Sequence, residues 1–277
     1  MVRVPKLSQK RIVSFRRRVW SSYRQHRRDF PWRRTDNPYR ITISEVMLQQ
    51  TQAQRVAPKY EAFVRHFSNW QALARASASA VLRQWSGLGY NRRAVALRDL
   101  ARAVVREHNG KLPRGQEALE ALPGIGPATA AAIRAFAFGE QSVYLDTNVR
   151  GVYIYEFFPD VPTVSDAALV PLIQQTLVGR SAREWYYALL DYGAWLKASR
   201  PNPTRRSAHY VRAGAFEGSS RQLRGRIVAV LLAAGSMTRA QVVSALGVER
   251  DRVTVSLDAL ERDGLLRRQA GSFALAR

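Results

Sequence analysis

The stretch LPGIGPATAAAIRAFAFGEQSVYLDTN at residues 122–148 limits the folds open to this chain more than any other. Pro123 and Gly124 are expected to end one helix. Gly126 permits a tight backbone turn, and Pro127 suits the first position of a following helix. The stretch therefore predicts a short helix, a glycine hairpin and a second helix.

A glycine hairpin of this kind suits a phosphate group of a nucleic acid. Its backbone N–H groups point outward beside the positive end of a helix dipole, which favours an anion and ignores base sequence. Downstream, the apolar residues 143–145 lead to Asp146, at the start of a helix expected over 147–155. That position favours a low carboxyl pKa and an ionised Asp146. A turn of this kind is also a common connection between helices, and an Asp at a helix start is commonly just a cap. The functional interpretation therefore rests on their occurrence together.

The formal net charge of +23 over 277 residues indicates a polyanionic partner. Arginines crowd the first expected helix and recur along the chain, at positions 11, 16, 17, 18, 24, 27, 28, 92, 93, 205, 206, 267 and 268. Binding to a nucleic acid is therefore expected, and it should weaken steeply with salt. A membrane is not expected as a partner, because no long apolar segment or basic amphipathic anchor accompanies the charge.

The absence of cysteine excludes disulfides, thiolate catalysis and an iron-sulfur cluster held by thiolates. The N-terminus MVRVPKLSQKR lacks the apolar core of a signal peptide. We therefore expect a protein that is not secreted and that works in the cytoplasm with the nucleoid, or in the nucleus. The length suits one large domain or two smaller ones.

Apolar spacing predicts helices, and no convincing strand, before the hairpin. Helices are expected over 7–28, 41–55, 94–108 and 116–121. Glu45 lies on the second of these, among apolar residues. If its side chain enters a cleft, desolvation raises its pKa and makes it a proton donor at neutral pH. The alternative is an ordinary surface glutamate on an amphipathic helix.

Several motifs together resemble one family. LPGIGPATAAAI followed by LDTNVRGV resembles the helix-hairpin-helix (HhH-GPD) DNA glycosylase superfamily. PWR, NPY, SEVMLQQTQ and WSGLGYNRR are similar to runs in its MutY-type adenine glycosylases. The resemblance covers roughly residues 30–212 and implies an all-α, two-lobed core over 1–213. One lobe is a six-helix barrel over about 38–145, and the second comprises the N-terminus and residues 146–213.

The resemblance implies a pair of catalytic carboxyl groups. Cleaving an N-glycosidic bond places positive charge on the sugar and electrons on the departing base, so an acid beside the base and a carboxylate beside C1′ suit the reaction. Glu45 would be the acid, Asp146 the carboxylate, and Asn148 would orient Asp146. The target nucleotide must first be extruded from the duplex. Arg33 would lie near the active site, and Asp191 of ALLDYGA would contact the target base or its water, although a helix-surface charge is the alternative for Asp191.

DNA contacts follow from the same motifs. Gln49 or Gln50 would enter the helix stack opposite the extruded base, and Tyr90 would stack or wedge unless it is ordinary packing. The other expected DNA-binding residues of the core are Arg92, Arg93, Gly124, Gly126, Thr129, Arg205 and Arg206.

Two departures from the family concern chemistry. Some relatives use a lysine just after the hairpin as a nucleophile, and Ala128 occupies that position here. We therefore expect a monofunctional glycosylase that uses water and has little lyase activity. Many MutY-type proteins have Tyr or Ser there, so Ala128 departs from them too. The cluster cysteines of most relatives fall on Lys197, Thr204, Ser207 and Ala213, so no iron-sulfur cluster and no other metal is expected, with a monovalent cation at the hairpin left open.

The C-terminal region shows a separate pattern. After a linker at 214–220, helices over 224–234, 239–246 and 250–264 and a hairpin over 265–276 predict a winged-helix module at 221–277. Its expected DNA contacts are Arg250, Arg252 and Thr254 in a groove and Arg267 and Arg268 on the wing. Winged helices also serve protein docking and dimerisation. Typical MutY-type proteins have instead a larger C-terminal domain that recognises oxidised guanine opposite adenine.

The leading hypothesis is excision of a mispaired or damaged base from double-stranded DNA by a monomer, with adenine as the first substrate. The missing recognition domain and Ala128 favour thymine or uracil opposite guanine. A DNA-binding protein without catalysis is the alternative of another class.

Overall fold

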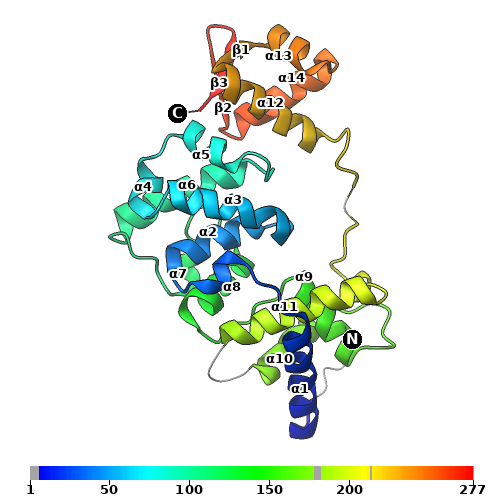
Figure 1. Cartoon of the computed structure of the whole chain (residues 1–277). Helices are drawn as coiled ribbons and strands as arrows, with labels where there is room; N and C mark the ends of the chain where they lie inside the picture. Colours follow the sequence, from blue (N-terminus) through cyan, green and yellow to red (C-terminus); the bar gives the residue numbers. More distant parts are fainter. Residues whose placement is uncertain (1–5, 178–181, 213, 277) are drawn as a thin grey trace. The chain divides into compact units, whose positions relative to one another are not determined.

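The structure is a computed structural model that describes residues 6–177, 182–212 and 214–276. It is mostly helical and divides into two compact units (Figure 1). The first contains residues 1–41, 114–117 and 126–212, and the second contains 42–113, 118–125 and 213–277. After the helices of the second unit, the chain returns to the first unit at Gly126, whereas the family resemblance predicts this boundary near residue 146. In the described part of the chain, no helix is long and apolar enough to span a bilayer.

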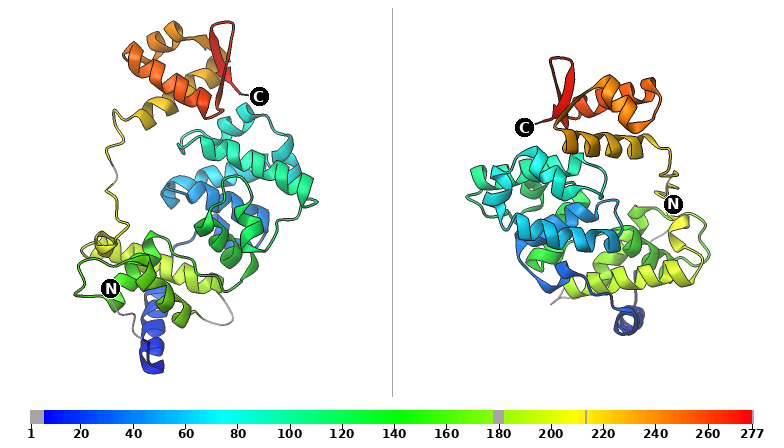
Figure 2. Two further views of the ribbon diagram at one scale, coloured as in Figure 1. Left: turned by 180° about the vertical axis from the view of Figure 1, so that it is seen from behind. Right: turned by 45° about the horizontal axis from the view of Figure 1, so that its top comes forward.

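The first unit is a helical bundle around an aromatic core. Its elements are α1 (Gln9–His26), the 3-10 turn η1 (Pro31–Arg34), α8 (Pro127–Phe138), α9 (Thr147–Phe157), α10 (Asp166–Thr176), α11 (Ala182–Ser199) and the 3-10 turn η2 (Pro203–Arg206). Helix α1 packs against α11 (Figure 2). Phe15 of α1 lies 5.3 Å from Tyr153 of α9 and 5.8 Å from Trp185 of α11 between ring centroids, and all three are fully buried. Burial of these large rings contributes much of the hydrophobic free energy that holds α1 against α9 and α11.

The second unit combines a helical part with the C-terminal region. Its helical part contains most of α2 (Pro38–Leu48), with α3 (Ala53–His66), α4 (Trp70–Arg75), α5 (Ala78–Trp85) and α6 (Arg92–Glu107). The single helix expected over 41–55 is wrong, because α2 ends at Leu48 and α3 begins at Ala53. Gln50 between them has a φ of 53°, a left-handed conformation that interrupts a right-handed helix.

The glycine hairpin lies between α7 (Gln116–Glu120) and α8. Gly124 has a φ of 79°, and a Cβ atom there would lie only 2.9 Å from the Cβ of Ala96, so both conformation and space require glycine. Gly126 has a φ of −100° and is the N-cap of α8, and Pro127 is the first helical residue. The prediction of helix, hairpin and helix is confirmed, but Gly124 rather than Gly126 makes the left-handed turn.

The C-terminal region has the winged-helix arrangement. It contains α12 (Ser220–Ala234), β1 (Ser236–Thr238), α13 (Arg239–Leu246), α14 (Arg250–Arg262), β2 (Leu266–Gln269) and β3 (Ser272–Leu275). The strands form an antiparallel sheet in the order β1-β3-β2, with Phe273 of β3 opposite both Met237 and Arg268. A reciprocal capping box between Thr238 and Gln241 begins α13 at the expected residue. The short β1 was not foreseen, since three residues carry too little periodicity.

Candidate active site

Asp146 is the N-cap of α9. Its Oδ1 accepts the N–H of Val149 at 2.7 Å, and its Oδ2 accepts the side-chain amide of Asn148 at 3.2 Å. The amide of Asn148 therefore orients the carboxyl group, as the family resemblance implies. Asp146 remains partly exposed to solvent. A carboxyl group held by two donors in this way can stabilise a positive charge that develops beside it.

The pKa of Asp146 departs from the expectation. Burial raises the pKa of this carboxyl above its ordinary value, although the hydrogen bonds from Val149 and Asn148 and the charge of Arg150 act in the opposite direction. The expectation of a low pKa is wrong for the DNA-free protein, because desolvation outweighs the helix terminus. Arg150 is itself committed to Asp166, whose two carboxylate oxygens lie 2.8 Å from its nitrogens.

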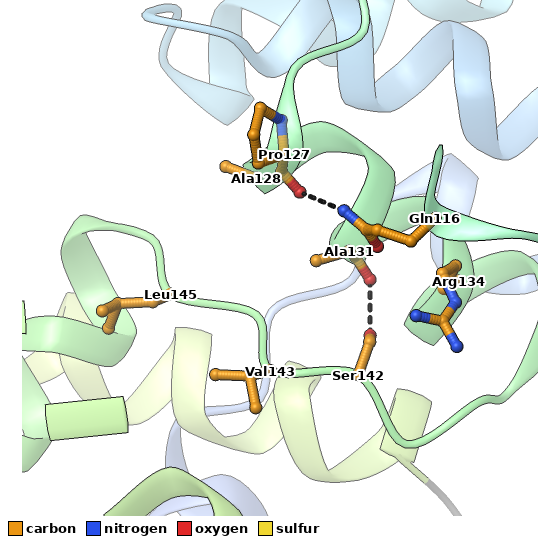
Figure 3. Close-up of a pocket in the computed structure, with 8 residues that line it drawn as sticks. All are labelled: Gln116, Pro127, Ala128, Ala131, Arg134, Ser142, Val143 and Leu145. Atoms are coloured by element: carbon orange, nitrogen blue, oxygen red, sulfur yellow. Dashed lines mark hydrogen bonds between the residues drawn. The ribbon is translucent and has the colours of Figure 1, made fainter. Parts of the chain in front are cut away.

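A pocket of about 330 Å³ lies beside the residue that precedes Asp146 (Figure 3). Its lining residues are Gln116, Pro127, Ala128, Ala131, Arg134, Ser142, Val143 and Leu145. The side chain of Gln116 donates to the carbonyl of Pro127 at 3.2 Å, and the hydroxyl of Ser142 donates to the carbonyl of Ala131 at 2.7 Å. The pocket thus brings Ala128, at the start of α8, together with the segment that leads into Asp146, although Asp146 itself does not line it.

Glu45 occupies an unusual position on α2. Residues 41–44 and 46–47 are buried, whereas Glu45 is partly exposed. Glu45 is thus the one residue between 41 and 47 that reaches solvent, and its expected role as an acid stays a prediction. Glu45 belongs to the second unit and Asp146 to the first.

Asp191 has a different role from the expected one. Its side chain has no exposed surface. Arg33 binds it with both terminal nitrogens, at 2.7 and 2.8 Å, and Arg28 binds it through its Nε at 2.6 Å and its backbone N–H at 2.9 Å. Burial opposes the charge of Asp191, but the arginines outweigh it and lower the pKa of the carboxyl. With its oxygens occupied in this way, Asp191 does not meet a base directly and instead fixes Arg33, whose side chain is only 5% exposed. Arg28 was missed as a partner, because no pattern in the sequence links it to a residue 163 positions away.

The expected wedge residues lie in two loops of the second unit. Gln49 and Gln50 follow α2, and Tyr90 precedes α6. Gln50 and Tyr90 both adopt left-handed backbone conformations, with φ of 53° and 50°. The side-chain amide of Gln49 donates to the carbonyl of Gly124 at 3.3 Å, which ties the first loop to the glycine hairpin. Strained residues of this kind are concentrated at functional sites.

Arg93 does not have the role that its sequence position suggested. Its guanidinium group donates to the carbonyls of Val46 at 2.9 Å, Met47 at 3.0 Å and Gln49, all at the end of α2. Burial lowers the pKa of Arg93 to about 10, which still leaves it charged at neutral pH. The prediction of a phosphate contact is therefore wrong for Arg93 as it lies here, because both of its terminal nitrogens already donate to protein oxygens. Arg92 is 71% exposed and 3.5 Å from Asp263.

The remaining predicted contacts of the core divide in the same way. Arg206 donates to the carbonyls of Phe158, Pro159 at 2.7 Å and Val161 at 3.2 Å, so it closes a loop rather than facing solvent. Arg205 is exposed and remains a predicted DNA contact. Thr129 lies in the first turn of α8, after Gly126.

The segment around Arg206 contains the positions that correspond, by the family resemblance, to cluster cysteines. Thr204 and Ser207 are buried there, and Lys197 is exposed. Residues 164 and 207 form a parallel bridge. Ala213 lies outside the described residues.

The predicted DNA-binding residues of the winged-helix region differ in how free their side chains are to contact DNA. Arg250 and Arg252 are exposed, but Arg252 donates to the carbonyl of Gly218 at 2.6 Å. Arg268 lies over the ring of Phe273, 5.4 Å from its centroid, and Arg267 is partly exposed. Thr254 donates its hydroxyl to the carbonyl of Arg250 at 2.9 Å, and the exposed Asp251 also lies on α14. The surface of α14 is thus not uniformly basic.

Comparisons with known proteins agree with these features. The HhH-GPD superfamily base excision DNA repair protein family matches residues 43–168. The chain is 36% identical over 281 residues to the adenine DNA glycosylase of Mycobacterium tuberculosis (strain ATCC 25618 / H37Rv), and the match covers 91% of this chain and 90% of that protein.

Solved structures show the same architecture. A thermostable thymine-DNA glycosylase matches with a TM-score of 0.61 and 30% identity, covering 70% of this chain and 91% of that one. A non-covalent complex of endonuclease III with DNA matches with a TM-score of 0.55 and 17% identity, covering 70% and 87%, and shows the fold alone. The chain is therefore a DNA glycosylase that belongs to the HhH-GPD base excision repair superfamily and, within it, to the family of adenine DNA glycosylases.

Proposed function

We propose that this protein removes adenine from mispairs in double-stranded DNA, with adenine opposite 8-oxoguanine as its first substrate. The observation that carries the choice of base is the extent of the match to the mycobacterial adenine DNA glycosylase, which spans nine-tenths of both chains. The match also covers nine-tenths of that relative, so the adenine assignment does not depend on a larger C-terminal domain.

Glu45 supplies the proton and Asp146 the charge in the proposed reaction. The bond between C1′ and the base nitrogen breaks with its electron pair going to the base, which takes the proton of the Glu45 carboxyl. Positive charge then develops on the sugar, and the Asp146 carboxylate stabilises it. Water adds to C1′ and gives a proton to the Glu45 carboxylate, which restores the acid and leaves free base and an abasic site. The partial exposure of Glu45 on an otherwise buried helix turn and the two donors that hold Asp146 support these roles.

Strand cleavage is not part of the proposed reaction. A lyase forms a Schiff base with an amine, and Ala128, which lines the pocket at the start of α8, has none. The enzyme is proposed to work as a monomer in the nucleoid or nucleus, with no metal at its catalytic carboxyl groups. The exposed Arg205 and Arg250 would contact phosphates, the latter extending the DNA contact to the winged-helix region.

Thymine or uracil opposite guanine is the second candidate substrate. It is favoured by the 30% identity to a thymine-DNA glycosylase whose length is covered to 91%. Many adenine-specific relatives have Tyr or Ser at the position of Ala128. Alanine lacks their hydroxyl group, so it cannot make the polar contact to the sugar that such a group would offer.

Single-turnover excision from a set of matched duplexes tests the substrate. The duplexes contain A opposite 8-oxoguanine, A opposite G, T opposite G and U opposite G in one sequence context. We expect release of adenine from the first two and no release of pyrimidines. Release of thymine or uracil with adenine untouched would reverse the assignment, and release from none of the four would contradict the proposed substrate classes. Asp146→Asn in the same assay controls for a contaminating glycosylase.

A further inference from the structure

Arg93 connects three parts of the second unit that the proposed reaction uses. Its Nη1 donates to the carbonyls of Val46, Met47 and Gln49, and its Nη2 donates to the hydroxyl of Thr51 at 3.0 Å and the carbonyl of Gly89 at 3.3 Å. The first carbonyls belong to the last turn of α2, where a helix leaves carbonyl groups without partners. The guanidinium group therefore caps the C-terminal end of the helix that carries Glu45, and the first carbonyl it binds is that of Val46, the residue after Glu45.

Two of these acceptors precede the two strained residues. The carbonyl of Gln49 belongs to the peptide that leads into Gln50, and the carbonyl of Gly89 belongs to the peptide that leads into Tyr90. Both following residues have left-handed backbone conformations, which cost free energy for residues with a side chain. One planar group thus fixes the peptide before each of them and so holds both loops in conformations that they would otherwise leave.

The rings around the guanidinium group complete its placement. It lies 5.3 Å from the ring centroid of Trp85 and 5.2 Å from that of Tyr90. Trp85 is fully buried and donates its indole N–H to the same carbonyl of Gly89, at 3.0 Å. Arginine suits such a site because its flat fork donates in several fixed directions and also stacks on aromatic rings, whereas lysine offers one point charge.

We propose that Arg93 is a positioning residue for base extrusion, which holds the Gln50 and Tyr90 loops and the end of the Glu45 helix in one arrangement before DNA binds. This inference rests on the proposed function. DNA would then bind to the Gln50 and Tyr90 loops in their final conformations. The entropy cost of ordering these two loops would not add to the cost of base extrusion. Arg93 does not bind a phosphate in this role.

Two arginines of α6 test the proposal in the full-length protein. Arg93→Gln and Arg106→Gln each remove one charge from this helix, but only the first removes the bonds to both loops. Arg106 is exposed beside Glu107 at the other end of the helix. Extrusion is followed by the fluorescence of 2-aminopurine at the target position, which rises when the base leaves the stack. We expect Arg93→Gln to lose this rise and to slow single-turnover excision by roughly 100-fold, the size of effect that a small misplacement produces. Arg106→Gln should keep both.

The salt dependence of binding separates positioning from phosphate contact. Each lost phosphate contact lowers the slope of log Kd against log salt by about 0.9. The slope for Arg93→Gln should equal that of the wild type on a duplex with a tetrahydrofuran abasic analogue. A slope lower by that amount, or extrusion and excision equal to the wild type, would overturn the proposal. Equal losses in Arg106→Gln would overturn it as well, because they would trace the effect to charge alone.

Two further variants cover the case in which Arg93→Gln does not fold. Arg93→Lys keeps the charge but not the fork, and Thr51→Val removes one acceptor without changing the volume of the side chain. Both should reduce extrusion in protein that is still folded at the assay temperature, and Thr51→Val should reduce it less. Wild-type extrusion in Thr51→Val and Arg93→Lys would contradict the proposal. A failure of the proposed function would look different. The wild type would then excise no base, while its extrusion signal would still exceed that of the Arg93 variants.

Discussion

The carboxylate of Asp191 on α11 binds the guanidinium group of Arg33 through both of its oxygens, at 2.7 and 2.8 Å. The two side chains are 0% and 5% exposed, so this pair lies in the interior, where an unpaired charge is costly. It joins the η1 turn to a helix more than 150 residues away in sequence. The PWR motif is therefore anchored by an ion pair and not by its aromatic packing alone.

Asp191→Asn should destabilise the protein by about 3 to 5 kcal/mol, because it leaves two arginines facing a neutral group in a buried site. The lowered pKa sets the sign of the pH dependence: stability from this carboxylate is present above the ordinary pKa of Asp and is lost as pH falls through the folded-state pKa. The difference between wild type and variant in chemical denaturation should thus shrink in acid. Asp29→Asn, which breaks the exposed pair with Arg34, is the control and should change nothing measurable.

Asp146→Asn should abolish excision and stabilise the fold at neutral pH. Burial raises the pKa of Asp146, so the stability contributed by its protonated form is complete below the ordinary pKa of Asp and is lost as pH rises through the folded-state pKa. Asparagine also caps a helix and still accepts the N–H of Val149. Melting temperatures at neutral and acid pH check this, and a lower melting temperature of the variant at neutral pH would contradict it.

Ala128→Lys should create a covalent intermediate with DNA. Ala128 is exposed in the first turn of α8 and lines the pocket beside Leu145, the residue before Asp146. A lysine there gains a lowered pKa from the helix N-terminus, which favours the neutral amine that attacks C1′. Borohydride should trap a complex of this variant and none of the wild type. Trapping of the wild type to the same extent would show that another amine performs the reaction.

Arg205 and Arg206 are neighbours with different predicted roles. Arg205→Gln should lower the salt slope of DNA binding by about 0.9 and leave the melting temperature unchanged, because its side chain is exposed. Arg206→Gln should do the opposite, since it removes the donors to the carbonyls of Phe158, Pro159 and Val161. The same slope change in both variants would refute the distinction.

The local features of the fold were predictable because they depend on neighbouring residues. Gly124 and Pro127 marked the hairpin, Thr238 marked the start of α13, and Asp146 marked the start of α9. The break between α2 and α3 was not predictable from apolar spacing, because the turn there is contacted by Arg93, which lies 42 to 47 positions away in the sequence.

Arginine roles were the main failure of prediction from the sequence. Arg33, Arg93 and Arg206 carry the same charge as the exposed Arg92 and Arg205, and nothing local distinguishes them. The first three each donate several hydrogen bonds to a carboxylate or to backbone carbonyls, whereas the side chains of Arg92 and Arg205 remain exposed, and only tertiary structure decides this difference. The same limit applies to the pKa of Asp146, where burial outweighs a helix terminus that was visible in the sequence.

The most direct test of the catalytic assignment is single-turnover release of adenine opposite 8-oxoguanine by Glu45→Gln, with DNA affinity measured on the same duplex. Glutamine keeps the shape of the side chain and removes only the proton that the reaction needs. The assignment predicts unchanged affinity and a rate lower by at least about 100-fold, the usual contribution of a general acid. A variant that binds equally well and releases adenine at the wild-type rate would contradict it.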